Sequence, residues 1–136
     1  MLTRLRVRNF KRLHDVDIEL DRSVVLVGPN NSGKTTALQA LALWDIGIRR
    51  WNEKRKDTAL PKLRPGVTIN RRDLISIPVP NANLLWHDLH VRKVEQIQDE
   101  STKRKKPKTE NVRIEVIING ITEGREWTCG LEFYYA

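Results

Sequence analysis

Cysteine is nearly absent from this sequence, in which Cys129 is the single thiol. One thiol excludes an intramolecular disulfide and fits a reducing cytoplasm, and we interpret Cys129 as a small buried side chain. The sequence also lacks any run of about 18 apolar residues, which excludes a membrane-spanning helix. Its first residues alternate charged and apolar side chains and lack the apolar stretch of a signal peptide. We therefore expect a cytoplasmic globular domain.

Acidic residues are too few to balance the basic ones. The sequence contains 25 Lys and Arg against 17 Asp and Glu, giving a formal net charge of +8 and a pI near 10.0. This surplus favours polyanionic partners, nucleic acid first. It is concentrated in residues 49–72 and 103–108, from which the candidate DNA contacts are Arg49, Arg50, Lys103, Arg104, Lys105 and Lys106. Such runs also occur as solvated loops, so the charge by itself leaves both interpretations open.

Regular alternation of apolar and polar residues predicts two strands near the N-terminus, over residues 2–10 and 14–20, joined as an antiparallel pair. The run Val24-Val25-Leu26-Val27 is apolar on both faces and predicts a central strand that is covered on each side. Apolar residues at helical spacing predict a helix over residues 35–48. Residues 49–80 lose this periodicity and contain several prolines, so we expect an irregular basic insertion there.

The C-terminal part contains a second alternating pattern. Residues 112–118 and 127–135 alternate as in a β-hairpin, and Asn119-Gly120 signals a turn, so we expect the hairpin loop over 119–124. Residues 84–94 are compatible with a short helix or a strand, and the polar tract over 98–110 is expected to be mobile. The chain thus divides into strands, glycine-rich loop and first helix (1–48), a basic and mobile segment (49–110), and a hairpin (111–136).

A glycine-rich loop carries the chemistry. The sequence Gly28-Pro29-Asn30-Asn31-Ser32-Gly33-Lys34-Thr35 satisfies the phosphate-binding pattern G-x-x-x-x-G-K-[ST] at every defined position. The two glycines allow the backbone to curl closely around an anion, and its N–H groups then point inward at the start of a helix. Lys34 is expected to bridge the β- and γ-phosphates of ATP, Thr35 to ligate Mg²⁺, and Thr36 to donate to the α-phosphate.

Two stretches around this loop resemble a known family. They are Leu5-Arg6-Val7-Arg8-Asn9-Phe10-Lys11 and Val27 through Thr35, and they are similar to the N-terminal part of the ABC-like ATPase heads of SMC, RecF and OLD proteins. The resemblance implies an α/β P-loop NTPase fold, here the N-terminal lobe of an incomplete domain with an antiparallel β-subdomain. It also implies ATP-driven homodimerisation of heads on DNA, in repair, chromosome maintenance or phage defence.

The same resemblance places Lys11 and Arg12 where the first turn approaches the nucleotide. Their alternative role is that of solvated turn charges, and the sequence does not decide between the two. We favour the basic insertion at Arg49 and Arg50 over the lysine cluster at 103–106 as the DNA surface, because it follows the helix that holds the phosphates.

Several elements of a complete head are not recognised in this sequence. Gln96 and Gln98 precede the hairpin and do not match a glutamine loop, Glu115 lies inside an alternating strand, and the histidines show neither a switch nor a metal pattern. No catalytic residue is therefore assigned, and we expect the remaining half of the head to supply the signature and Walker B motifs. The alternative is a nucleotide-sensing or DNA-binding module that does not hydrolyse ATP. A compact kinase or GTPase is disfavoured, because neither lid arginines nor Asn-Lys-x-Asp occur.

Overall fold

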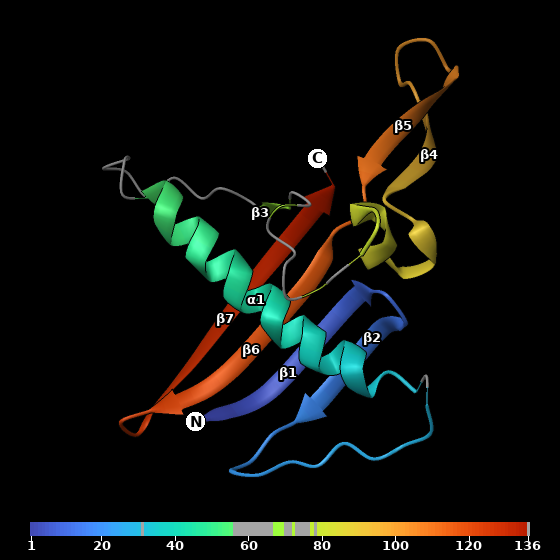
Figure 1. Cartoon of the computed structure of the whole chain (residues 1–136). Coiled ribbons are helices and arrows are strands. Elements are labelled where there is room, and N and C mark those ends of the chain that lie inside the picture. Colours follow the sequence, from blue (N-terminus) through green and yellow to red (C-terminus); the bar gives the residue numbers. More distant parts are fainter. Residues whose placement is uncertain (31, 56–66, 70–71, 73–76, 78, 136) are drawn as a thin grey trace.

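The structure is a computed structural model, and it describes residues 1–30, 32–55, 67–69, 72, 77 and 79–135. A five-stranded sheet lies beneath a long helix (Figure 1). The helix is α1 (Lys34–Arg55), and the strands of this sheet are β1 (Leu2–Phe10), β2 (Leu13–Glu19), β3 (Val67–Ile69), β6 (Ile114–Thr122) and β7 (Arg125–Tyr135). Two short 3-10 helices, η2 (Ala82–Leu85) and η3 (His87–Leu89), lead into a separate two-stranded sheet of β4 (Arg92–Gln98) and β5 (Lys105–Asn111).

The strand order of the large sheet is β2-β1-β6-β7-β3, and only the pairing of β3 with β7 is parallel. The predicted antiparallel pair at the N-terminus is confirmed, with Leu5 opposite Ile18 and Val7 opposite Val16. The other edge of β1 pairs with β6, which is distant in sequence. Arg8 and Glu115, which lie opposite each other, are 107 residues apart. The mainly antiparallel sheet with its covering helix agrees with the expected α/β class.

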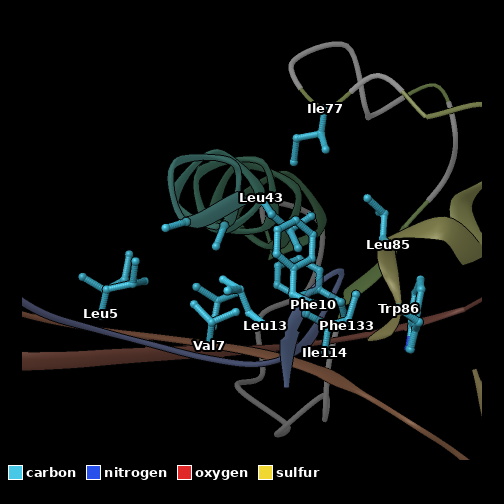
Figure 2. Close-up of a cluster of buried hydrophobic side chains, with 14 residues drawn as sticks. Leu5, Val7, Phe10, Leu13, Leu43, Ile77, Leu85, Trp86, Ile114 and Phe133 are labelled. Atoms are coloured by element: carbon cyan, nitrogen blue, oxygen red, sulfur yellow. The ribbon is translucent and has the colours of Figure 1, made fainter. Parts of the chain in front are cut away.

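The hydrophobic core lies between α1 and one face of this sheet (Figure 2). Every second residue of β6 is buried, and β1 contributes Leu5 and Val7 to the same side. Each large apolar side chain that is fully buried contributes about 1.5–3 kcal/mol relative to exposure. The buried apolar residues are Leu5, Val7, Phe10, Leu13, Ala37, Ala40, Leu43, Ile77, Leu85, Trp86, Ile114, Val116, Ile118 and Phe133.

The helix α1 is longer than its periodicity predicts. It continues to Arg55, so residues 49–55 are helical and the expected irregular insertion is wrong for them. Val67–Ile69 of the same segment form β3, and most of the remaining residues up to 80 lie outside those described. Within the described part of the chain, no helix has both the length and the apolar character needed to span a bilayer.

The run Val24–Val27 corrects another expectation, because it forms no strand. Val25 and Val27 are 80% and 88% exposed, whereas Leu26 packs against the core. An apolar sequence favours burial of its side chains. A central strand also needs neighbouring strands whose backbone groups bond to its N–H and C=O groups. The five places of the large sheet are taken by other segments, so among the described residues this run has no strand beside it.

The C-terminal hairpin is confirmed, but its predicted loop is wrong. β6 runs through Asn119-Gly120 to Thr122, and Glu123 and Gly124 make a two-residue turn with φ of 51° and 75°. Positive φ at both central residues is what the tight type I′ hairpin turn requires. Gly120 has a packing role instead, because a Cβ there would lie 2.3 Å from the indole ring of Trp127, its cross-strand partner.

The polar tract over 98–110 also differs from expectation, since it contains β5 and was predicted to be mobile. Residues 84–94, left open between helix and strand, contain the end of η2, all of η3 and the start of β4. We call the β4–β5 hairpin, residues 92–111, the arm. It stands away from the five-stranded sheet in Figure 1.

Candidate functional site

The glycine-rich loop ends where α1 begins, so its last residues lie against free N–H groups of the helix. The first turn of α1 contains no acidic side chain, and the N-terminal end of its dipole is therefore uncompensated by a carboxylate from that turn. The N–H of Ser32 donates to the carbonyl of Pro29 at 3.2 Å, which bends the loop, and the N–H of Ala37 donates to Gly33 at 2.9 Å. The start of a helix is a position that favours an anion, because its first N–H groups have no partner within the helix.

Both defining glycines have steric reasons to be glycine. Gly33 has a φ of +97°, in a region that residues with a Cβ rarely adopt, and an added Cβ would lie 3.3 Å from Leu13. At Gly28 an added Cβ would lie 2.7 Å from the hydroxyl oxygen of Ser32. The contact with Leu13 shows that the loop is fitted against the start of β2, which joins the site to the body of the domain.

Lys34 folds back into the loop. Its ammonium group donates to the carbonyl oxygen of Gly28, so the first and last parts of the motif are joined through one side chain. Thr35 is exposed at the helix start, whereas Thr36 is buried, with 9% of its surface exposed. The structure thus brings together Gly28, Gly33, Lys34 and Thr35. Pro29 and Asn30 are exposed beside them, and Asn31 lies outside the described residues.

A magnesium ion would find one side-chain ligand here. The exposed hydroxyl of Thr35 is of the oxygen-donor type that Mg²⁺ prefers, and phosphate oxygens and water complete such sites in nucleotide-binding proteins. Among the described residues, no three His, Cys, Asp or Glu side chains form a group that could hold a metal. The residues present therefore fit an ion that arrives with a nucleotide.

Lys11 occupies the turn between β1 and β2 with a φ of +49°. Its ammonium donates to the Gln39 side-chain oxygen of α1 at 2.6 Å, and its own N–H donates to Leu85 at 2.7 Å. Burial lowers the pKa of Lys11, because desolvation disfavours the charged ammonium. The structure places Lys11 beside the helix that begins at the loop, while Arg12 is exposed on the same turn. No motif in the sequence indicated that Gln39 contacts Lys11.

Three histidines line one pocket near that turn. The rings of His14 and His87 have centroids 5.0 Å apart, and the Nδ1 atom of His87 lies 2.7 Å from the carbonyl oxygen of Lys11. His90 lines the same open pocket of about 600 Å³, together with Asn9 and Arg92. His14 and His87 are separated by 73 residues, so no local pattern could have predicted their contact.

The candidate DNA contacts fall on two separate elements. Arg49 and Arg50 lie in the C-terminal half of α1, where Arg49 pairs with Asp45 at 3.0 Å and Arg50 is half-buried. Lys103 and Arg104 are exposed in the turn at the tip of the arm, and Lys105 and Lys106 begin β5. Figure 1 shows the end of α1 and the arm on different sides of the molecule. The two clusters therefore form distinct surfaces.

The remaining polar candidates have structural partners. Glu115 lies inside β6, as expected, and accepts a hydrogen bond from Arg8 at 3.2 Å. Cys129 is half-buried, and desolvation raises the pKa of its thiol. Its carbonyl accepts a hydrogen bond from the Trp44 indole at 3.2 Å. The first contact joins β1 to β6 and the last joins α1 to β7, so the loop is left as the site with the clearest chemistry.

Comparison with known proteins identifies the family of this chain. A family model described as the AAA ATPase domain matches residues 1–121. The OLD nuclease of Thermus scotoductus is 51% identical over 43 residues, a stretch that is 32% of this chain and 8% of that protein. The chain thus matches a small part of that relative's length. The two matches confirm the resemblance to the N-terminal part of OLD-type ATPase heads.

Proposed function

We propose that this chain, which belongs to the AAA ATPase domain family, binds ATP with Mg²⁺ through residues 28–36 and works on DNA as the N-terminal part of an ATPase head. The observation that carries the nucleotide site is the Lys34 ammonium held inside the loop at the start of α1. With no carboxylate in the first helical turn, backbone N–H groups, helix dipole and ammonium all favour an anion at that position.

Each loop residue has a proposed role in this complex. Lys34 exchanges its bond to the Gly28 carbonyl for bonds to the β- and γ-phosphates, and the loop N–H groups hold the β-phosphate. Thr35 provides a hydroxyl ligand to Mg²⁺, which neutralises phosphate charge when bound. Thr36 is proposed to donate to the α-phosphate. Lys11, fixed on Gln39, and the exposed Arg12 add positive potential from the neighbouring turn.

The rest of the head is proposed to cover the exposed apolar run before the loop. Val25 and Val27 expose apolar surface beside a backbone that lacks a strand neighbour among the described residues. A strand from the remaining half of the head would bury both, and that half would also supply the carboxylate and signature residues for hydrolysis. We further propose that two heads dimerise on DNA, with residues 1–48, 49–110 and 111–136 as parts of one domain.

The nucleotide proposal is tested by replacing Lys34 with Ala. A fluorescent ATP analogue should bind at least about tenfold more weakly with Mg²⁺ present, because a hydrogen bond to a charged group contributes about 1.5–3 kcal/mol. The matched control is Lys108→Ala, which removes one exposed lysine from the arm and should leave the affinity unchanged. Equal affinity of the wild type and Lys34→Ala, with unchanged circular dichroism, would rule out the site.

A further inference from the structure

The arm is unusual in burying neither of its faces. All fourteen residues of β4 and β5 are exposed, although a two-stranded hairpin alone is marginally stable in water. Its root is anchored: the N–H of Val112 donates to Val91 at 3.0 Å, and the indole of the buried Trp86 donates to the carbonyl of Val112 at 2.6 Å. The fold therefore joins an exposed two-stranded hairpin to the body of the domain through hydrogen bonds at its root.

One face of the arm is electrically balanced. Directly opposite residues of an antiparallel ladder share a face, and this one carries Lys93, Glu95, Ile97, Lys106, Lys108 and Glu110. Lys93 pairs with Glu95 at 2.5 Å and Lys108 with Glu110 at 2.6 Å. Lys106 pairs with Asp99, in the turn, at 3.0 Å. We call this surface the paired face, since each of its lysines has a carboxylate beside it.

The other face carries cations without carboxylates. It consists of Arg92, Val94, Gln96, Gln98, Lys105, Pro107, Thr109 and Asn111, and we call it the amide face. Arg92 lies at the root and Lys105 near the tip, and neither makes an ion pair with any residue that the structure describes. Gln96 lies between them along the ladder, Gln98 lies directly opposite Lys105, and Val94 is 62% exposed. The same ribbon is thus neutralised on one face and cationic on the other.

The length of the arm and the side chains of its amide face fit duplex DNA. A two-stranded ribbon enters the major groove of B-form DNA, which is about 12 Å wide, and seven residues of strand extend about 23 Å. Cations at the two ends can contact phosphates while the amide side chains of the same face contact base edges, where Gln and Asn bind adenine. The deep, narrow major groove of double-stranded RNA does not admit such a ribbon.

We propose that the amide face of the arm docks in the major groove of duplex DNA, with Arg92 and Lys105 on the phosphates and Gln96 and Gln98 toward the bases. This inference rests on the DNA partner of the proposed function and assigns the contact to the arm, in place of the surface at Arg49 and Arg50 that the sequence favoured. Because the arm lies within residues 1–121, it belongs to the part of the chain that matches the family.

The test compares two double variants on the same hairpin. Arg92→Gln with Lys105→Gln discharges the amide face, and Lys93→Gln with Lys108→Gln removes two charges from the paired face. Binding of the complete chain to a fluorescent 20-base-pair duplex is measured across a salt series. Each phosphate contact contributes about 0.9 to the log–log slope, so the amide-face variant should lose up to about 1.8 and the paired-face variant less than about 0.5.

A third variant separates amides from charge. Gln96→Ala with Gln98→Ala should weaken binding about tenfold on adenine-containing duplexes, since bidentate amide contacts discriminate bases at that level. Its salt slope should remain that of the wild type, because no charge is removed. All these side chains are exposed, so circular dichroism should be unchanged in every variant.

Three outcomes would contradict the proposed docking of the amide face. Equal loss of slope in both double variants, or a larger loss on the paired face, overturns the face assignment. Equal affinity for a double-stranded RNA of the same length overturns docking in the groove. Absence of wild-type binding to duplex DNA at low salt removes the DNA part of the proposed function and this inference with it, while ATP binding and its loss in Lys34→Ala are measured independently.

Discussion

Strands β6 and β4 of this molecule are stabilised by different interactions. In β6, alternate residues such as Val116 and Ile118 are buried under α1, whereas every residue of β4 is exposed. The body is thus stabilised by removing apolar surface from water. The arm depends on ladder hydrogen bonds, short-range ion pairs and the anchor at Val112. Stability should therefore reside in the body, and substitutions on the arm should affect recognition.

The largest expected effect on stability comes from removing a buried side chain of the body. Phe133→Ala removes a ring that is 0% exposed, and should lower the free energy of unfolding by about 3–5 kcal/mol. The matched arm variant is Ile97→Ala, at a position 43% exposed, which should cost about 0.5 kcal/mol. Urea titration monitored by tryptophan fluorescence measures both. Similar losses would show that the arm and body share one core.

A smaller effect tests whether the glycine-rich loop is stabilised together with the body. Gly33→Ala places a Cβ on a backbone with φ of +97° and 3.3 Å from Leu13. The strain should destabilise the fold by about 1–2 kcal/mol, since L-residues disfavour left-handed backbone by that amount. Because Leu13 belongs to the core, the urea midpoint should fall together with ATP-analogue affinity. Loss of affinity at an unchanged midpoint would separate the loop from the body.

The smallest effect concerns the turn of the arm. The carboxylate of Asp99 accepts hydrogen bonds from the N–H and hydroxyl of Ser101 and pairs with Lys106. The hydrogen bond from the Ser101 hydroxyl is the largest cause of the lowered pKa of Asp99, followed by Lys106 and then by the Ser101 N–H. A lowered pKa in the folded state means that the ionised form stabilises the turn. That contribution is present above the unfolded value of about 3.9 and is lost as the pH falls through the folded value.

Amide exchange measured by NMR tests this turn. The Ser101 amide should exchange faster as the pH falls below about 4, relative to its intrinsic rate. Asp99→Asn should remove that pH dependence and leave the urea midpoint of the body unchanged, because the side chain lies on the exposed arm. A lower midpoint in Asp99→Asn would contradict the separation of arm and body.

Sequence reasoning succeeded where one face of an element meets the core. The alternation around Val7 and Val116 and the helical spacing of α1 predicted elements that the structure contains, because local periodicity records which side is buried. The arm has no buried side, so the sequences of its strands show no alternation of apolar and polar residues. The tract that contains β5 was therefore interpreted as mobile. The motif around Lys34 could be predicted because every required group is contiguous.

Thus the sequence by itself determined the glycine-rich motif, the helix that follows it and the amphipathic strands. Only the tertiary structure decided that Val24–Val27 lies outside the sheet, that Gly120 makes room for Trp127 and that Lys11 bonds to Gln39. It also decided which lysines of the arm are paired with carboxylates. The physical reason is that periodicity and propensity act over a few neighbouring residues, whereas a pairing partner is selected by the folded chain among many distant segments.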